Sequence, residues 1–177
     1  MITDTETIQI EDWVLRVRVP DGPGPFPVIL MLHGWTGDEN AMGVFARALP
    51  ERFLLIAPRA PHESTIGGYS WYPMTNGKTW PDLDDFRPAV GALLELIDNW
   101  PASAPPPADF SNLRLAGFSQ GAALTYAFSL IHPERVTALA GLAGFLPEGS
   151  TSLFQGKHLE GKPVYISHGT NDELVSI

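Results

Sequence analysis

The stretch LRLAGFSQGAALTYAF, Leu113–Phe128, decides the fold because two structural patterns meet in it at one residue. An apolar run stops at Ser119, which lies between Gly117 and Gly121, and a helix-like segment of small residues follows at once. The pattern predicts a strand that turns sharply into a helix, and such a turn can present a serine as a nucleophile. The alternative is a serine that only caps the helix, which is a common role.

Outside this stretch, apolar runs and helical patterns alternate along the chain. The expected strands are Ile8–Val19 (one strand or a hairpin), Val28–Gly34, Phe53–Pro61, Leu113–Phe118, Val136–Phe145 and Pro163–Ser167. The expected helices are Asp38–Leu49, capped by Asp38, then Asp82–Trp100 and Gln120–Ile131. This alternation predicts an α/β fold with a mostly parallel central sheet and helices on both faces. A length of 177 residues fits one domain over residues 1–177.

The composition excludes several classes of function. The chain has 11 Lys and Arg against 20 Asp and Glu, which gives a net charge of −9. Because the Lys and Arg residues are scattered along the sequence, no nucleic-acid partner is expected. The chain has no cysteine, which excludes disulfides, a thiol nucleophile and Cys-ligated zinc. It shows neither an apolar run long enough to span a bilayer nor a secretory leader. We therefore expect no membrane span and a cytoplasmic location.

The segment LHGWTGDEN, Leu32–Asn40, follows a strand expected to be buried on both faces, and ligand sites gather at such strand ends. In α/β-hydrolases one oxyanion donor comes from this loop and the other is the N–H after the nucleophile. This rule assigns the backbone N–H groups of Trp35 and Gln120. His33 is either a general base or a structural residue that holds the loop. The order of a hydrolase triad, with histidine last, favours the structural role.

The segment VYISHGTNDELV, Val164–Val175, supplies a candidate acid. An apolar strand leads to His168 and Gly169, and Asp172 follows in the loop. The order serine, then acid, is that of the α/β-hydrolase triad. The alternative is that Asp172 caps a short helix.

Six segments together resemble the bacterial carboxylesterase and phospholipase family of α/β-hydrolases, which includes the acyl-protein thioesterases. They are LHGWTGDEN, IAPRAP, GGYSWYPM, LAGFSQGAAL, AGLAGFLP and GKPVYISHGTNDELV, in collinear order over nearly the whole chain. The resemblance implies the α/β-hydrolase fold, Ser119 as nucleophile, Asp172 as triad acid, and Trp35 with Gln120 as the oxyanion hole. It implies a serine carboxylesterase that acts on small-molecule esters of short or medium chain, without cofactor or metal.

The resemblance also implies that Trp71, in the expected long loop His62–Pro81, and Phe145 with Leu146 form walls of the substrate pocket. The alternative for these aromatic and apolar residues is packing in the core. Long loops within compact domains are usually functional or disordered.

The sequence departs from the family at its end, because no histidine follows Asp172 before Ile177. His168, His132, His158 and His62 are weak substitutes by position. We therefore expect a chain shortened relative to the family, without the last strand–helix portion. The exposed strand edge would favour a homodimer that covers it. Two alternatives stay open: a catalytically impaired, hydrolase-like binding domain, and an enzyme for thioesters or lysophospholipids.

Overall fold

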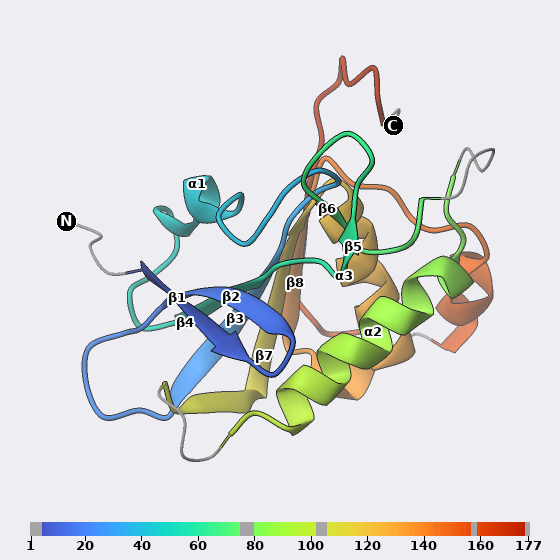
Figure 1. The fold of residues 1–177 in the computed structure, drawn as a ribbon. Coiled ribbons are helices and arrows are strands. Elements are labelled where there is room, and N and C mark those ends of the chain that lie inside the picture. The colour runs from blue at the N-terminus through green and yellow to red at the C-terminus, as the bar shows by residue number, and fades with distance from the viewer. Residues whose placement is uncertain (1–4, 75–79, 102–105, 157–158, 176–177) are drawn as a thin grey trace.

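A seven-stranded sheet in the order β1-β2-β4-β3-β7-β8-β9 forms the centre of the computed structural model (Figure 1). The structure describes residues 5–74, 80–101, 106–156 and 159–175. The strands of this sheet are β1 (Thr5–Ile10), β2 (Trp13–Arg18), β3 (Phe26–Leu32), β4 (Leu54–Pro58), β7 (Ala108–Phe118), β8 (Ala138–Leu142) and β9 (Val164–Ser167). The neighbours from β4 to β9 pair in parallel, whereas β1 and β2 form an antiparallel hairpin at one edge. The predicted α/β class and mostly parallel sheet are confirmed.

Strand β3 explains why an unbroken apolar run forms the middle of the sheet. Its side chains alternate between two hydrophobic cores, with Val28, Leu30 and Leu32 on one face and Ile29 and Met31 on the other. A strand buried on both faces has no polar side, so it reads as a continuous run.

Helices cover both faces of the sheet. One face carries α2 (Leu83–Asp98) and α3 (Gln120–Ile131), which pack against each other (Figure 1). Helix α2 begins with a reciprocal capping box, in which the Asp85 N–H donates to Asp82 Oδ1 at 3.1 Å and the Asp82 N–H to Asp85 Oδ2 at 2.8 Å. The other face carries the short α1 (Gly43–Ala46). Two 3₁₀ helices, Pro133–Arg135 and Ser150–Gly156, complete the described helical segments.

The predicted helix Asp38–Leu49 is wrong in length and in its cap. Helix α1 has only four residues, and Met42 precedes it without a side-chain cap. The Asp38 Oδ1 atom instead accepts from the N–H of Asn40 at 2.8 Å, which closes a local turn. The predicted long loop is also more regular than expected, because β5 (His62–Glu63) and β6 (Tyr69–Ser70) form an antiparallel hairpin within it.

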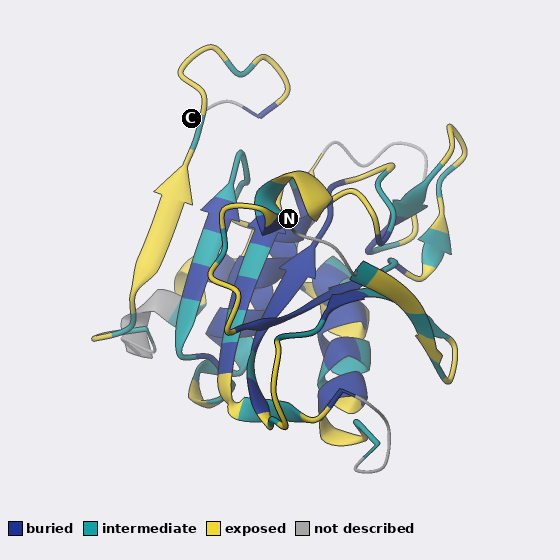
Figure 2. Cartoon of the chain, turned by 90° about the vertical axis from the view of Figure 1, so that its left-hand side faces the viewer, coloured by how far each residue is buried: buried dark blue, intermediate teal, exposed yellow. Residues whose placement is uncertain are grey.

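Strand β9 is the other edge of the described sheet, and all four of its residues are exposed (Figure 2). Val164, Tyr165 and Ile166 are 45%, 61% and 65% exposed, although apolar residues in a row are typical of a strand that is buried. No helix in the described ranges is long and apolar enough to cross a membrane.

Candidate active site

Ser119 stands at the sharp turn between β7 and α3 in a backbone conformation that is rare for a residue with a side chain. Its φ is 53° and its ψ is −117°. Such strain persists only where the surroundings enforce it, and it concentrates at functional sites. The surroundings here are Gly117 and Gly121: a Cβ on Gly117 would lie 2.2 Å from the Gly121 carbonyl oxygen, and a Cβ on Gly121 would lie 2.1 Å from the Leu32 carbonyl oxygen. Only glycine permits this close approach of strand and helix.

The Ser119 hydroxyl makes no capping hydrogen bond to α3, so the interpretation as a mere N-cap is not supported. Its backbone is fixed instead: the Ser119 N–H donates to the Leu142 carbonyl at 2.9 Å, and its carbonyl accepts from Ala122 and Ala123. The side chain is partly exposed at the carboxyl edge of the sheet. The geometry therefore presents a hydroxyl that is uncommitted to the helix.

The loop after β3 lies directly against this serine. A Cβ on Gly34 would be 3.2 Å from Ser119 Cβ, so the loop backbone reaches the turn without a side chain between them. Gln120 is the first residue of α3, and a helix leaves the N–H groups of its first turn without intrahelical acceptors. No hydrogen bond from the N–H of Trp35 or Gln120 to another described residue is present. These two N–H groups therefore stay the predicted oxyanion donors.

The β5–β6 hairpin holds the loop after β3 in place. The Thr36 N–H donates to the Tyr69 carbonyl and the Tyr69 N–H to the Gly37 carbonyl, both at 2.9 Å. Gly68 makes this pairing possible, because it has a φ of +69° and a Cβ there would lie 1.9 Å from the Thr36 carbonyl oxygen. The two loops are thus joined through their backbones beside Ser119.

His33 is a structural residue, as the order of the triad suggested. It is fully buried, its Nδ1 lies 2.7 Å from the Gly34 carbonyl oxygen, and its Nε2 accepts from the N–H of Ala60 at 3.0 Å. A carbonyl oxygen can only accept and an N–H can only donate, so the ring is neutral with its proton on Nδ1. Burial lowers the pKa of His33 below its ordinary value of 6.5, against smaller opposing effects of the Gly34 carbonyl and of Asp38. Both ring nitrogens are occupied, so His33 has none left to act as a base.

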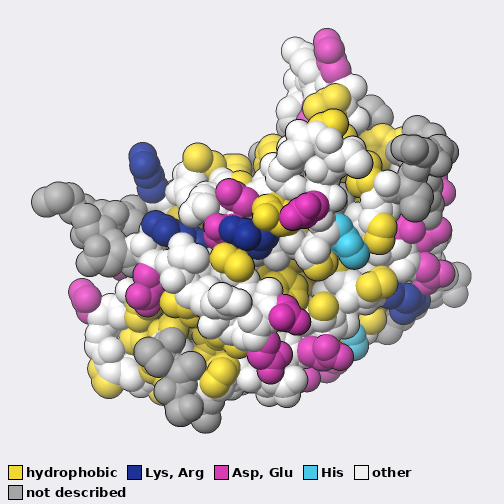
Figure 3. Space-filling model, viewed as in Figure 1, with side chains coloured by type: hydrophobic (Ala, Val, Ile, Leu, Met, Phe, Trp, Pro, Cys, Tyr) yellow, Lys and Arg dark blue, Asp and Glu magenta, His cyan; other side chains and the backbone are white. Residues whose placement is uncertain are grey.

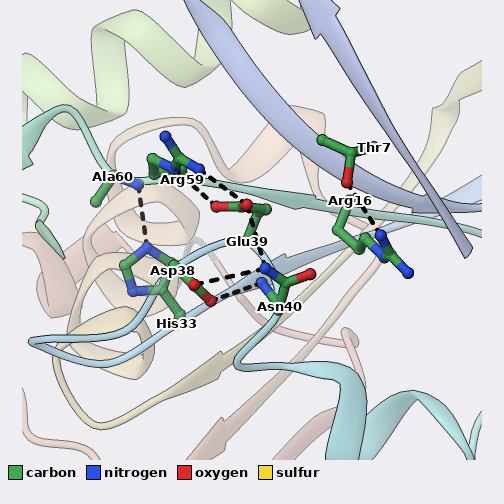
Figure 4. A network of polar contacts seen from close by, with 8 residues as sticks. All are labelled: Thr7, Arg16, His33, Asp38, Glu39, Asn40, Arg59 and Ala60. Atoms are coloured by element: carbon green, nitrogen blue, oxygen red, sulfur yellow. Dashed lines mark hydrogen bonds and ion pairs between the residues drawn. The ribbon is translucent and has the colours of Figure 1, made fainter. Parts of the chain in front are cut away.

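The sequence patterns did not identify an ion pair between the buried Glu39 and the partly exposed Arg59, which braces the same loop (Figure 4). Glu39 accepts from Arg59 through both oxygens, with Nε–Oε2 at 2.7 Å and Nη2–Oε1 at 2.9 Å. The guanidinium of Arg59 also lies over the ring of Tyr69 at 4.8 Å. Hydrogen bonding from Arg59 holds the pKa of the Glu39 carboxyl below its ordinary value. The sequence signal for this pair was weak: an acidic residue, Glu39, follows β3, and a basic residue, Arg59, follows the neighbouring β4.

Trp71 is fully buried, so the geometry favours core packing over a wall of the substrate pocket. Its indole Nε1 donates to the His33 carbonyl at 2.8 Å, and its backbone N–H donates to Gln120 Oε1 at 2.9 Å. The Gln120 side chain also donates to Ser70 Oγ at 3.0 Å. Trp71 and Gln120 therefore tie the hairpin to the strand end and the helix that flank Ser119.

Phe145 and Leu146 line an apolar groove of about 350 Å³. Its other walls include residues of α3, β8 and β9 and the side chain of His168. Gly144 connects the groove to the strand–helix turn, since a Cβ on it would lie 3.4 Å from the Ser119 carbonyl oxygen. A pocket role for Phe145 and Leu146 stays a prediction.

Asp172 lies in the loop after β9, two strands from β7 and at the same carboxyl edge of the parallel sheet. Its Oδ1 accepts from the N–H groups of Val175 at 2.9 Å and Leu174 at 3.0 Å. These two bonds, with a smaller contribution from His168, lower the pKa of Asp172. The carboxylate is therefore ionised near neutral pH.

The described histidines include no partner for the Ser119 hydroxyl. The Nε2 atom of His168 is directed at its own loop, since it lies 2.7 Å from the Val175 carbonyl oxygen and 3.5 Å from Asp172 Oδ2. His132 lies at the far end of α3, and His158 lies outside the described residues. Within the same ranges, no group of three or more His, Asp or Glu side chains is placed to hold a metal ion.

Comparisons with known proteins agree with this fold and show the family. The sequence profile described as phospholipase/carboxylesterase matches residues 17–177. Acyl-protein thioesterase 1 of Yarrowia lipolytica is 26% identical over 174 residues, which cover 90% of this chain and 75% of the relative. A probable carboxylesterase of Oryza sativa subsp. japonica is 32% identical over 127 residues, which cover 67% of this chain and 46% of the relative. The solved structure of esterase PE8 superimposes with a TM-score of 0.70 at 26% identity, over 90% of this chain and 76% of that one.

Proposed function

Because the chain belongs to the phospholipase/carboxylesterase family of carboxylic ester hydrolases, we propose that Ser119 is the nucleophile of a serine carboxylesterase. Its substrates are carboxylic esters of short to medium chain. The single observation that carries the proposal is the strained backbone of Ser119, whose partly exposed hydroxyl makes no capping hydrogen bond to the helix it precedes.

In the proposed reaction, a base takes the proton of the Ser119 hydroxyl and the oxygen attacks the ester carbonyl. The oxyanion accepts from the N–H groups of Trp35 and Gln120, and the alcohol leaves with a proton from the base. The base then takes a proton from water, and the water oxygen attacks the acyl carbon. The Ser119 oxygen leaves with that proton, which releases the carboxylic acid. Asp172, whose carboxylate is held by two backbone hydrogen bonds, is the acid that orients the base.

A second candidate is a hydrolase-like binding domain with impaired catalysis. It is favoured by one observation: no described histidine hydrogen-bonds to the Ser119 hydroxyl. Removing the base of a serine hydrolase costs on the order of 10⁶-fold in kcat. For the active enzyme, the base has to come from a group that is not hydrogen-bonded to Ser119 in the described structure, and a histidine of a second copy of the chain that covers β9 is one source. The proposed homodimer follows from this edge, and light scattering tests it.

The test is covalent labelling of the chain by a fluorophosphonate, which requires an activated serine. We expect labelling of the wild-type chain and none of Ser119→Ala, with hydrolysis of p-nitrophenyl butyrate lost in the same variant. Gly169→Ala is the matched control, since its Cβ would meet nothing closer than Asp172 Cβ at 4.0 Å. No labelling of the folded wild-type chain would favour the binding domain. A panel of thioesters and lysophospholipids then separates the remaining substrate classes.

A further inference from the structure

The apolar groove beside Phe145 and Leu146 contains a buried hydroxyl that the proposed mechanism does not use. Tyr126, on α3, lines this groove and is only 7% exposed. Its hydroxyl makes no hydrogen bond to another described residue. Buried polar groups are nearly always hydrogen-bonded, so an unpartnered one that faces a groove points to a ligand. We call this groove the Tyr126 groove.

The sheet fixes the position of the Tyr126 hydroxyl. A Cβ on Gly141 would collide with the hydroxyl oxygen, so the phenol lies directly on the backbone of β8. Gly141 pairs with Gly117 of β7, which precedes Ser119 by two residues, so the hydroxyl lies close to the strand–helix turn. Burial raises the pKa of Tyr126 above its ordinary value of 10.0. The hydroxyl therefore keeps its proton at neutral pH and can donate it to an acceptor.

The Tyr126 groove extends from the carboxyl edge of the sheet toward the opposite edge. Gly144 lines it at the carboxyl edge, beside the Ser119 carbonyl oxygen. Tyr126 lies near the middle of α3, and the lining continues beyond it with Leu130, Leu139 and Leu159. Apart from Tyr126 and His168, every described side chain of the lining is apolar. A buried water needs several polar partners, so this lining suits an aliphatic chain with a single oxygen better than a water.

The charges around the groove favour a ligand without negative charge. Asp172 Oδ2 lies 3.5 Å from Nε2 of His168, so a carboxylate lies next to the lining of the groove. On the face of the molecule shown in Figure 3 the charged side chains are mostly acidic, and the net charge of the chain is −9. This field repels a free carboxylate, whereas it does not repel a neutral ester.

We propose that the Tyr126 groove binds the acyl chain of the ester and selects a chain with an oxygen acceptor near its middle. The ester group lies at the carboxyl edge, the Tyr126 hydroxyl donates to the mid-chain oxygen, and the apolar end of the chain packs among the leucines beyond. Few polar groups in an apolar lining fix the orientation and the specificity of a ligand. The inference rests on the proposed esterase function and deepens it, because it names the class of substrate.

The test measures by calorimetry how the full chain with Ser119→Ala, which prevents turnover, binds methyl octanoate and its 4-oxo, 5-oxo and 6-oxo derivatives. We expect at least one oxo ester to bind on the order of tenfold more tightly than methyl octanoate. Adding Tyr126→Phe, which removes only the hydroxyl, should abolish this preference without weakening the binding of methyl octanoate. The matched control adds Tyr165→Phe, which removes a hydroxyl on β9 outside the groove, and should keep the preference.

Several results would overturn the proposal. They are no binding of any ester, equal binding of all of them, a preference that survives Tyr126→Phe, and tighter binding of the octanoate anion than of methyl octanoate. Urea denaturation adds another, because removing an unpartnered hydroxyl should not destabilise the fold. A clear destabilisation by Tyr126→Phe would show that the hydroxyl has a partner within the protein. Fluorophosphonate labelling of Ser119 does not depend on the groove, so failure of the acyl selection and failure of the esterase are distinguishable.

Discussion

Ser119 and Asp172, the two residues proposed to act together, are held in opposite ways. Ser119 depends on contacts between distant segments, because its strained backbone is enclosed by Gly34, Gly117 and Gly121. Asp172 depends on its own neighbours, since its carboxylate accepts from N–H groups two and three residues further along the chain. The elbow region around Ser119 is buried and braced, whereas the β9 region that carries Asp172 is exposed.

The two residues of the proposed site therefore depend on different interactions: Ser119 on tertiary packing, and Asp172 on hydrogen bonds within its own loop. Backbone strain persists only when tertiary packing outweighs it, so the nucleophile exists only in the folded sheet. A carboxylate held by an Asx turn needs no partner beyond its own segment. Substitutions should therefore disrupt the elbow region strongly and the β9 region weakly.

The largest expected effect compares a glycine from each region. Gly121→Ala should lower the free energy of unfolding by about 3 kcal/mol, because the new Cβ meets the rigid backbone of Leu32 and His33. Gly169→Ala should change it by less than about 0.5 kcal/mol, because its Cβ meets only Asp172 Cβ, at an ordinary van der Waals distance of 4.0 Å. Urea denaturation followed by tryptophan fluorescence measures both. Equal effects would remove the contrast between the regions.

A second comparison uses two aromatic residues. Trp71→Phe should destabilise the fold by about 2 kcal/mol, because it leaves the buried His33 carbonyl without its donor and opens a small cavity. Tyr165→Phe on β9 should be close to neutral, because the ring is largely exposed. Thermal unfolding of both variants and of the wild-type chain measures these effects. A neutral Trp71→Phe would contradict the role of Trp71 in holding the hairpin against the end of β3.

The third prediction concerns pH. The pKa of His33 is lowered in the folded state, so below its ordinary value of 6.5 the unfolded chain binds a proton that the folded chain does not. Stability is therefore full above that pH and falls as the pH drops toward the folded pKa, by at most about 1.4 kcal/mol per pH unit. The pKa of Asp172 is also lowered, but from 3.8, so its contribution is lost only in stronger acid.

Unfolding free energies measured between pH 7 and pH 5 test this assignment. His33→Gln should flatten the pH dependence, whereas Asp172→Asn should keep the wild-type slope. An unchanged slope in His33→Gln would show that another group titrates in this range.

The smallest effect is confined to the loop after β9. Asp172→Ala removes the acceptor of the Leu174 and Val175 N–H groups, so hydrogen exchange at these two amides should accelerate severalfold. Asp172→Asn keeps an acceptor oxygen and should stay near the wild-type rates. Global unfolding should change far less in either variant than in Gly121→Ala, and a shift as large as in that variant would mean that the loop is coupled to the core.

The alternation of the main strands with α2 and α3, the mostly parallel sheet and the sharp turn at Ser119 followed from the sequence. These features depend on local or periodic signals: the two-faced apolar run of β3, the acidic start of α2, and the glycines on either side of Ser119. The structural role of His33 was favoured by its position before the nucleophile, and its two hydrogen bonds agree.

Only the tertiary structure decided what lies around the serine. The helix expected from Asp38 is short because Asp38 closes a turn while Glu39 pairs with Arg59, which lies 20 residues away. Trp71 is buried because its indole reaches the His33 carbonyl, and the β5–β6 hairpin depends on Gly68 touching Thr36. A local pattern specifies a residue's own backbone, but the partner of a side chain is set by which distant segments the sheet brings together.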